Sequence, residues 1–291
     1  MSSHAQPHLM DRAQAVVVIP LYKKALSASE WFSIQRTLTM LAQYPIAIVC
    51  PKHLAAHFTQ ESQNWPHPAI AVEAFEDHFF KSVAGYNQLL VSRAFYQRFA
   101  QYTFMLIAQT DALILSDQLA YWCERNYSYI GAPFFAGFAH PEKPLRMIGV
   151  GNGGVSLRKI ADFLRTFDKV RYLPNWLAPK PKSLVDVAGM ARYIRHRFVF
   201  ATNFWPLFPK VNEDVFWGML MPRSASFFQV AHISEAVAFA FDNEPAYLYT
   251  QNGKRLPFAC HAWERFDLPF WQNTLAAHGI DIDSALSMTA Q

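Results

Sequence analysis

The sequence has little of what marks several large classes of protein. Only 3 of its 291 residues are cysteines. Because Cys50, Cys123 and Cys260 lie far apart, a disulfide framework or a zinc site is disfavoured and a reducing compartment fits best. Charged residues make up 16% of the chain, the formal net charge is +4, and no Lys/Arg cluster resembles a nucleic-acid-binding arm. We therefore expect no nucleic-acid partner.

Long apolar runs are also missing. The first 15 residues, MSSHAQPHLMDRAQA, contain no apolar core of the kind that a signal peptide requires. No window reaches the ~18 to 20 uncharged apolar residues that are needed to span a bilayer. We expect a cytoplasmic protein, with peripheral contact at the inner membrane as an additional hypothesis.

What the chain does have is apolar material, since 52% of its residues are hydrophobic and 15% aromatic, enough for a sizeable core. The run AVVVIPLY at 15–22 predicts a buried strand ended by Pro20. A capping pattern from Ser27 to Glu30 then predicts a helix over 27–44, followed directly by a strand at 45–51. This is the length of a parallel strand–helix–strand unit.

The same rhythm continues along the chain. The patterns predict helices at 82–100 and 116–126, the second capped by Ser116, and strands at 103–115 and 127–133. Alternation of this kind is typical of an α/β fold, with a mostly parallel central sheet covered on both faces. We expect a single domain over 15–270, a disordered tail at 1–14 and a C-terminal tail or helix at 271–291.

One carboxylate stands out in YTFMLIAQTDALIL, residues 102–115, because Asp111 interrupts an otherwise apolar segment. A buried, unpaired carboxylate costs several kcal/mol unless something compensates it. Ligands in α/β sheets gather at the carboxyl ends of strands, so Asp111 fits a metal- or ligand-binding carboxylate at a strand tip. A solvated loop acid or a helix cap is the alternative, and position alone leaves both open.

The second half carries three further candidates. The glycines in MIGVGNGGVSLRK, 147–159, allow close approach of the backbone to a ligand, although the spacing is not that of a phosphate-binding loop and a tight structural turn is the alternative. Asn212, Glu213 and Asp214 open a helix-like run, as a cap or as oriented catalytic acids. His261 lies among aromatic residues, where a histidine is usually structural but beside a strand-tip aspartate would complete a divalent metal site.

These motifs in this order carry a resemblance, and it covers residues 15–266. They are IPLYKK, YNQLLVSRAFYQRF, QTDALIL, LAYWCERNYSYIGAPF, GNGGVSLRK, NEDVFWG and PFACHAWE. Together they resemble a family of predicted bacterial glycosyltransferases, DUF5672. That family is similar to the GT-A class, with a Rossmann-like nucleotide-sugar domain, an Asp-x-Asp strand tip and a galactosyltransferase-like second half. The implied fold is a GT-A-like three-layer α/β/α sandwich.

The resemblance implies roles for residues at matching positions. Asp111 would be the remaining acid of the Asp-x-Asp element and His261 a second ligand for Mn²⁺ or Mg²⁺, while Gln109 replaces the first acid and puts metal affinity in doubt. Asp214, with Glu213 beside it, would be the base that faces the acceptor. The nucleotide-binding residues would be Pro20, Tyr22, Lys23, Gln109, Thr110 and Asp111, and the substrate-binding residues Asn152, Gly153, Gly154 and Trp217.

The implied function is transfer of a sugar from a nucleoside diphosphate sugar to a glycan or lipid-linked acceptor, in cell-surface polysaccharide synthesis. A nucleotide-sugar- or carbohydrate-binding protein without transferase activity is the alternative, because of Gln109. The helix dipole should lower the pKa of Asp214, and an acid placed as a base suits inversion without establishing it. The missing glycine fingerprint near the first strand disfavours a dinucleotide-dependent oxidoreductase.

The segment DVAGMARYIRHRFVFATNFW, 186–205, predicts an amphipathic helix. Val187, Met190, Ile194 and Phe198 form its apolar stripe, and arginines surround the rest. A basic amphipathic helix of this kind can rest on anionic lipid, which is the basis for expecting peripheral membrane contact. A core helix with a charged outer face is the alternative.

Overall fold

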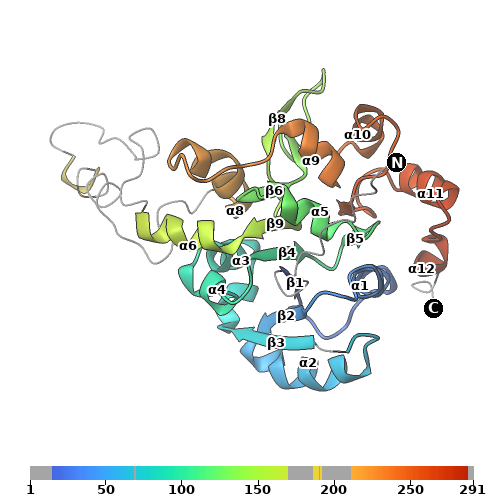
Figure 1. The fold of residues 1–291 in the computed structure, drawn as a ribbon, viewed down its shortest axis with the longest axis horizontal. Helices are drawn as coiled ribbons and strands as arrows, with labels where there is room; N and C mark the ends of the chain where they lie inside the picture. The colour runs from blue at the N-terminus through green and yellow to red at the C-terminus, as the bar shows by residue number, and fades with distance from the viewer. Residues whose placement is uncertain (1–14, 69, 170–185, 190, 192–210, 288–291) are drawn as a thin grey trace, which may run out of the picture.

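The structure, a computed structural model, describes residues 15–68, 70–169, 186–189, 191 and 211–287. Its centre is a six-stranded sheet with the strand order β3-β2-β1-β4-β9-β6 (Figure 1). The strands are β1 (Ala15–Pro20), β2 (Ile46–Pro51), β3 (Ile70–Phe75), β4 (Phe104–Ala108), β6 (Tyr129–Gly131) and β9 (Val155–Lys159). β1 pairs in parallel with β2 and β4, and β2 with β3, whereas β9 runs antiparallel to β4 and β6. The predicted α/β fold with a mostly parallel sheet is confirmed.

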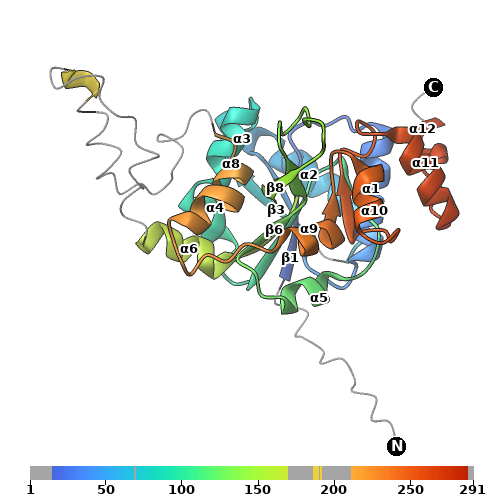
Figure 2. The ribbon, with the colours of Figure 1, turned by 90° about the horizontal axis from the view of Figure 1, so that it is seen from above.

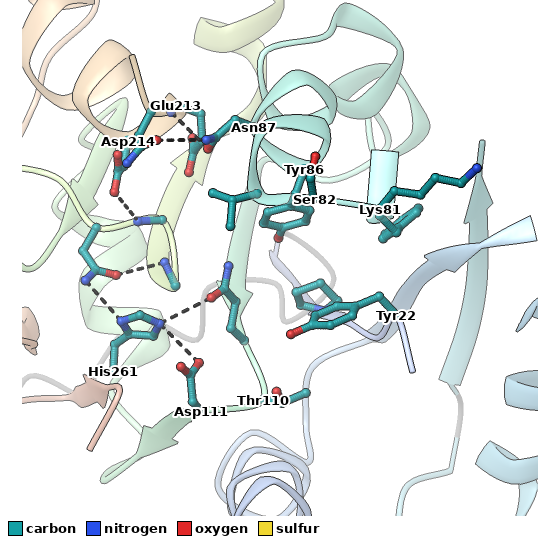
Figure 3. A pocket seen from close by; sticks show the side chains of 18 of the residues that line it. Tyr22, Lys81, Ser82, Tyr86, Asn87, Thr110, Asp111, Glu213, Asp214 and His261 are labelled. Atoms are coloured by element: carbon teal, nitrogen blue, oxygen red, sulfur yellow. Dashed lines mark hydrogen bonds and ion pairs between the residues drawn. The ribbon is translucent and has the colours of Figure 1, made fainter. Parts of the chain in front are cut away.

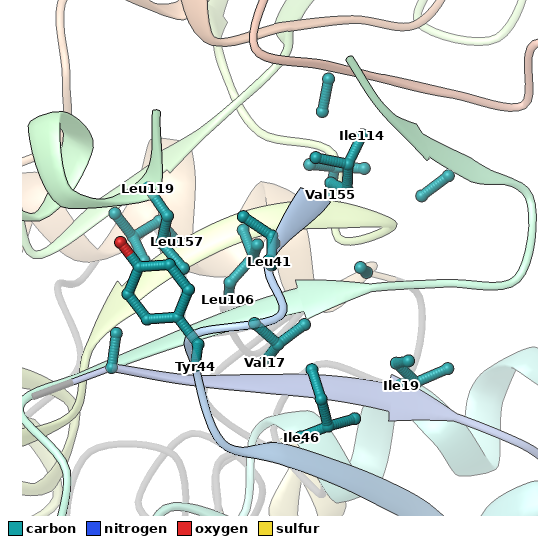
Figure 4. Packing of buried hydrophobic residues seen from close by; sticks show 14 of the residues in the cluster. Val17, Ile19, Leu41, Tyr44, Ile46, Leu106, Ile114, Leu119, Val155 and Leu157 are labelled. Atoms are coloured by element: carbon teal, nitrogen blue, oxygen red, sulfur yellow. The ribbon is translucent and has the colours of Figure 1, made fainter. Parts of the chain in front are cut away.

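Helices cover both faces of this sheet, as the alternation of side chains along β1 requires. Val17 and Ile19 belong to one buried cluster, part of which Figure 4 shows, and Val16 and Val18 belong to another. The first cluster includes side chains of α1 (Ala28–Met40), α2 (Ala55–Glu61) and α5 (Leu119–Glu124). The second includes side chains of α3 (Val83–Leu90), α4 (Arg93–Arg98) and α6 (Ile160–Lys169), on the opposite side in Figure 2. The three layers follow from this division.

The strand order positions the site. From β1 the chain adds β2 and then β3 on one side, and then returns to add β4 on the other side of β1. The connections after β1 and β4 therefore leave the sheet in opposite directions, and this opens a crevice at the carboxyl ends of these two strands. Ligands of open α/β sheets bind at such a switch point.

The C-terminal part adds a small sheet in the order β10-β11-β5, formed by β10 (Ala240–Phe241), β11 (Ala259–His261) and β5 (Ala112–Ile114). β11 is antiparallel to β5, with His261 opposite Ala112, so the histidine comes next to Asp111. A third cluster, which includes Trp263 and Trp271, packs behind this sheet. The elements around it are the ribbon β7 (Pro133–Phe135) and β8 (Met147–Val150), and the helices α9 (Ile233–Phe239), α10 (Pro245–Gln251), α11 (Leu268–Ala277) and α12 (Asp283–Ser287).

Two of the predicted segments are each divided in two. The helix predicted over 82–100 is α3 followed by α4, because the Ser92 side chain accepts a hydrogen bond from Phe95 N and starts a new helix. The strand predicted over 103–115 is β4 followed by β5. A turn at 109–111, in which Ala112 N donates to Gln109 O, passes the chain from the central sheet to the small one.

The predicted start of the next helix is wrong. α5 begins at Leu119 and has Gln118 at its N-cap position without a side-chain cap, so Ser116 is not its cap. Leu115 N still donates to Phe258 O, which holds the chain extended just before Ser116. In contrast, the capping box of Ser27 and Glu30 at α1 is confirmed.

The expected amphipathic helix at 186–205 lies largely outside the described residues, since 190 and 192–210 are not among them. Within the part of the chain that the structure describes, none of the helices combines the length and the apolar character needed to cross a membrane.

Candidate active site

A cavity of about 490 Å³ lies at the carboxyl ends of β1 and β4 and is called the first cavity below. Pro20 and Tyr22 come from the end of β1, and Gln109, Thr110 and Asp111 from the turn after β4. Figure 3 shows α3 and the acids at the start of α8 (Glu213–Val215) on the far side. The remaining sequence-predicted residues in its wall are Asn152, Gly153, Gly154, Glu213, Asp214 and His261.

Glu30 links the β1 and β4 sides of this cavity. Its Oε2 lies 2.8 Å from Lys23 Nζ, and its Oε1 accepts a hydrogen bond from Thr110 Oγ1 at 3.1 Å. Burial alone would raise the pKa of Glu30, but the hydrogen bonds from Lys23 and from the backbone of Ser27 lower it. Lys23 is thus tied to the cavity wall through Glu30, which the sequence identified only as a helix cap.

His261 holds two carboxylates together. Its Nε2 lies 3.2 Å from Asp111 Oδ1 and 3.3 Å from Gln109 Oε1, and its Nδ1 lies 3.0 Å from Asp242 Oδ1. Burial alone would lower the pKa of the imidazole, but Asp111 and Asp242 raise it to about 10. Burial would likewise raise the pKa of Asp111, but the positive imidazole keeps it below its ordinary value. This ion pair is what compensates the lone acid of the strand tip.

The side chains of Asp111, Gln109 and His261 supply part of a coordination site for a divalent cation. Among the residues that the structure describes, no group of three or more His, Cys, Asp or Glu is arranged to hold a metal ion. Asp111, Gln109 and His261 nevertheless bring a carboxylate oxygen, an amide oxygen and an imidazole nitrogen close together, and Asp242 contacts the other ring nitrogen of the histidine and orients it. Oxygen-preferring cations need further ligands, which a bound diphosphate supplies.

Of the two acids at the start of α8, Glu213 is buried and Asp214 is partly exposed. Glu213 Oε1 accepts a hydrogen bond from Arg158 Nη2 at 2.9 Å, and Asp214 accepts from Gly153 N and Val215 N at 3.3 and 2.7 Å. Burial raises the pKa of Glu213 to about 7 despite Arg158, and it also raises that of Asp214 despite the two backbone donors. The predicted lowering of the Asp214 pKa is therefore wrong, because loss of water outweighs the helix terminus.

The glycines after β8 allow the acids and the histidine to converge. A Cβ on Gly153 would lie 2.1 Å from Glu213 Oε1, and a Cβ on Gly154 would lie 2.1 Å from His261 Nε2. Between strands, Asn152 adopts a φ of 64°, and its Oδ1 accepts a hydrogen bond from Gly154 N at 2.9 Å. A side chain at either glycine would push the two halves of the cavity wall apart.

Trp217 does not belong to the cavity. It is fully buried in η6 (Phe216–Leu220), its indole N–H donates to Leu90 O at 3.0 Å, and its ring stacks on Phe228. The expected substrate contact at Trp217 is therefore wrong. The acids Glu213 and Asp214 line the cavity, but the apolar residues that follow them pack into the core.

Residues that the sequence did not single out complete the site. Asp242 follows the apolar run AVAFAF at 236–241, as Asp111 follows β4. This shared pattern could have identified Asp242 as a site residue from the sequence. Asn87 donates through Nδ2 to Asn212 Oδ1 at 3.1 Å and accepts through Oδ1 from Glu213 N at 3.2 Å, so α3 orients the start of α8. Arg158 carried no signal, because a charge on a strand usually points to solvent.

Fold and site together define an α/β protein with a cavity at the switch point of its parallel strands, where a histidine–carboxylate cluster faces the acids Glu213 and Asp214. The sequence matches the family described as "Protein of unknown function (DUF5672)" over residues 69–261, and the chain belongs to this family. No curated protein sequence matches the chain.

Several solved structures with some similarity are glycosyltransferases, and another is a 4-diphosphocytidyl-2C-methyl-D-erythritol synthase from Anaerococcus prevotii. The galactosyltransferase LgtC, in complex with donor and acceptor sugar analogues, has a TM-score of 0.46 at 12% identity, over 91% of this chain and 95% of that one. Mouse xyloside xylosyltransferase 1 has 0.43 at 11%, over 85% and 96%. Core-mannan synthase A of Aspergillus fumigatus, in its Mn/GDP form, has 0.40 at 11%, over 74% and 73%. Similarity at this level assigns no activity, so the chemistry rests on the site itself.

Proposed function

We propose that the protein is a nucleotide-sugar-dependent glycosyltransferase of the GT-A type. The observation that carries this proposal is the arrangement of the first cavity, where the strand-tip cluster of Asp111 and His261 faces the acids Glu213 and Asp214. Sugar transfer needs positive charge at a departing diphosphate and a base at the acceptor hydroxyl, and these two requirements match the two sides. The donor sugar would lie between them.

On the donor side, Tyr22 is 55% exposed at the cavity rim, where its ring can cover a base or ribose, and Lys23 is held beside it by Glu30. Asp111, His261 and the amide oxygen of Gln109 would hold Mn²⁺ or Mg²⁺ together with the diphosphate. A bound cation would supply charge neutralisation for the departing diphosphate. When no metal ion is bound, the protonated His261 supplies positive charge at this wall, whereas as a metal ligand it would be neutral.

On the acceptor side, Asp214 would act as the base. It removes the proton of the acceptor hydroxyl, the oxygen forms a bond to the anomeric carbon, and the bond from that carbon to the diphosphate breaks with its electron pair on the diphosphate. The raised pKa of Asp214 makes it a stronger base than an exposed aspartate. Glu213 is engaged by Arg158 and Asn87, so its proposed role is to orient its neighbour. A glycan or lipid-linked acceptor and a role in cell-surface polysaccharide synthesis belong to the same proposal.

Thermal unfolding with UDP, GDP and a panel of nucleotide sugars, each with and without Mn²⁺, tests the donor site. We expect at least one nucleotide to stabilise the wild type and to stabilise Asp111→Ala much less. Equal shifts in the two proteins would remove Asp111 from the site. If a nucleotide binds but no donor is turned over with Mn²⁺ present, the alternative of a non-catalytic nucleotide-sugar-binding protein, based on Gln109, would be favoured instead.

A further inference from the structure

A second cavity of about 460 Å³ lies beside the first one. The two share a wall, to which Asp111, Asn152, Asn212, Asp214 and His261 contribute. Glu213 lines only the first cavity, whereas Asp214 lines both. Asp214 therefore has access to a molecule on either side, and a group bound in the second cavity would lie next to the proposed base.

Aromatic rings also line the second cavity. Phe134 and Phe138 pack edge to face with ring centroids 5.3 Å apart, and Phe266 also lines the cavity. Phe138 is 43% exposed and has a φ of 51°, an unusual backbone conformation for a bulky side chain. Strained residues of this kind cluster at ligand-binding sites. The exposed part of the Phe138 ring is therefore available to a ligand in this cavity.

Polar groups surround these rings. Asn243 donates through Nδ2 to the carbonyl oxygens of Phe138 and Ala139 at 3.3 Å each, which fixes the turn that carries the exposed ring. Asp242 lies in the same wall, held by His261, and the exposed Arg265 has its guanidinium 5.1 Å from the centre of the Phe266 ring. The cavity thus combines aromatic faces with carboxylates and an amide.

This combination selects among classes of ligand. A pyranose ring has an apolar C–H face that packs on an aromatic ring and hydroxyl groups at its edge that donate to carboxylates. An alkyl chain would exclude water from the carboxylates Asp214 and Asp242 without donating a hydrogen bond to either, which is costly in a desolvated site. A phosphorylated ligand would meet the three carboxylates Asp111, Asp214 and Asp242, which outnumber the cations Arg265 and His261 in the same lining. A neutral sugar can pack on the aromatic rings and also donate hydrogen bonds to the carboxylates.

We propose that the second cavity binds a hexose unit of the acceptor, with one face of the ring on Phe138 and a hydroxyl group directed at Asp214. The role of Asp214 in this proposal rests on the proposed transferase function. Binding of the sugar does not, because it can be measured without turnover. It predicts that neutral glycosides bind to the protein at a site separate from the nucleotide.

Saturation-transfer NMR on the full chain tests this with methyl glycosides of glucose, galactose, mannose and N-acetylglucosamine, and with 1,8-octanediol as an alkyl probe. We expect at least one glycoside to bind and Phe138→Ala to weaken it about tenfold or more, while Phe138→Tyr retains it. Tyr121→Ala is the matched control, because Tyr121 is 50% exposed and lines neither cavity. Binding of no glycoside, binding of octanediol alone, or equal binding in Phe138→Ala overturns the proposal.

A second variant separates this inference from the proposed function. Tyr22 lines only the first cavity and is exposed, so Tyr22→Ala should weaken UDP or GDP binding and leave glycoside binding unchanged. Phe138→Ala should do the reverse. If no nucleotide binds but glycosides bind through Phe138, the transferase function fails and the sugar site stands. If glycoside binding is lost in Tyr22→Ala and kept in Phe138→Ala, the sugar occupies the first cavity and the inference fails.

Discussion

Arg158 Nη2 lies 2.9 Å from Glu213 Oε1, and both side chains are shielded from solvent. Arg158 also donates to Tyr96 Oη at 2.9 Å and to Ser156 Oγ at 3.0 Å, so the guanidinium is held from several directions. Glu213 Oε2 accepts no hydrogen bond from any residue that the structure describes. The pair connects β9 of the central sheet to the start of α8, beneath the cavity.

Arg158→Met should destabilise the fold strongly, because it leaves Glu213 buried without its cation. Loss of one partner of a buried ion pair typically costs about 3 to 5 kcal/mol in the free energy of unfolding. Urea unfolding measures this cost. The double variant Arg158→Met/Glu213→Gln should recover much of the loss, since it removes both charges. A cost below ~1 kcal/mol for the single variant would contradict the buried pair.

The Glu213 carboxyl should make stability depend on pH. Its pKa is raised from an ordinary value of 4.5 to about 7. Between these values the folded protein holds a proton that the unfolded chain has lost, so this contribution is present below pH 4.5 and is lost as the pH rises through 7. Relative to Glu213→Gln, the wild type should lose on the order of 3 kcal/mol over this range. If the difference in free energy of unfolding between the wild type and Glu213→Gln does not change with pH, the raised pKa of Glu213 is excluded.

Asp214→Asn should retain nucleotide binding and lose sugar transfer by ~10² to 10⁴-fold, because it keeps the shape of the side chain and removes its basicity. Initial rates with a saturating donor give the measurement. Glu213→Gln is the matched comparison, as it changes the neighbouring acid that lines only the first cavity. The opposite ranking would make Glu213 the base, and full activity in both would leave the pair as a structural start of α8.

Gln109→Glu should strengthen Mn²⁺ binding, because it adds a carboxylate where the amide oxygen of Gln109 lies 3.3 Å from His261 Nε2. Affinity for hard cations rises with the number of charged ligands, so we expect the Mn²⁺ dissociation constant measured with UDP present to fall about tenfold. Titration of free Mn²⁺ by its paramagnetic resonance signal reports this directly. Asp111→Asn should act in the opposite direction. No change in either variant would place the cation elsewhere.

Glu30→Ala and Ser27→Ala should separate a cap from a binding-site contact. Both break the capping box of α1, and loss of an N-cap typically costs about 1 kcal/mol. Only Glu30→Ala also frees Lys23 and Thr110, so it alone should weaken nucleotide binding. Unfolding curves and UDP titrations of the two variants make the comparison. Equal UDP affinities would mean that Lys23 does not need Glu30 as its anchor.

Local interactions were predictable from the sequence. The Ser27–Glu30 capping box needs residues that are three apart, and the strand β1 needs only a short β-branched run. The position of Asp111 at a strand tip followed from the apolar segment before it, and the order of strands and helices indicated the α/β class. Each of these features depends on hydrogen bonds or hydrophobic patterns within a few turns of the chain.

Burial was harder to predict, because it depends on which element covers a residue. Trp217 was expected in the cavity and packs in the core, and the Asp214 pKa was expected to fall but rises with burial. The break between α3 and α4 also escaped the helix pattern, since the apolar residues keep nearly the same spacing across Ser92. Propensity and periodicity say little about desolvation, which is a property of the assembled layers.

The sequence by itself determined the class of fold, the cap of α1, and the acids and glycines from which the site is made. Only the tertiary structure decided how they meet: His261 lies between Asp111 and Asp242 because β11 pairs with β5, and Arg158 reaches Glu213 from 55 residues away because β9 enters the central sheet beside β4. Strand pairing over such separations is set by packing of the whole domain and leaves no local pattern in the chain.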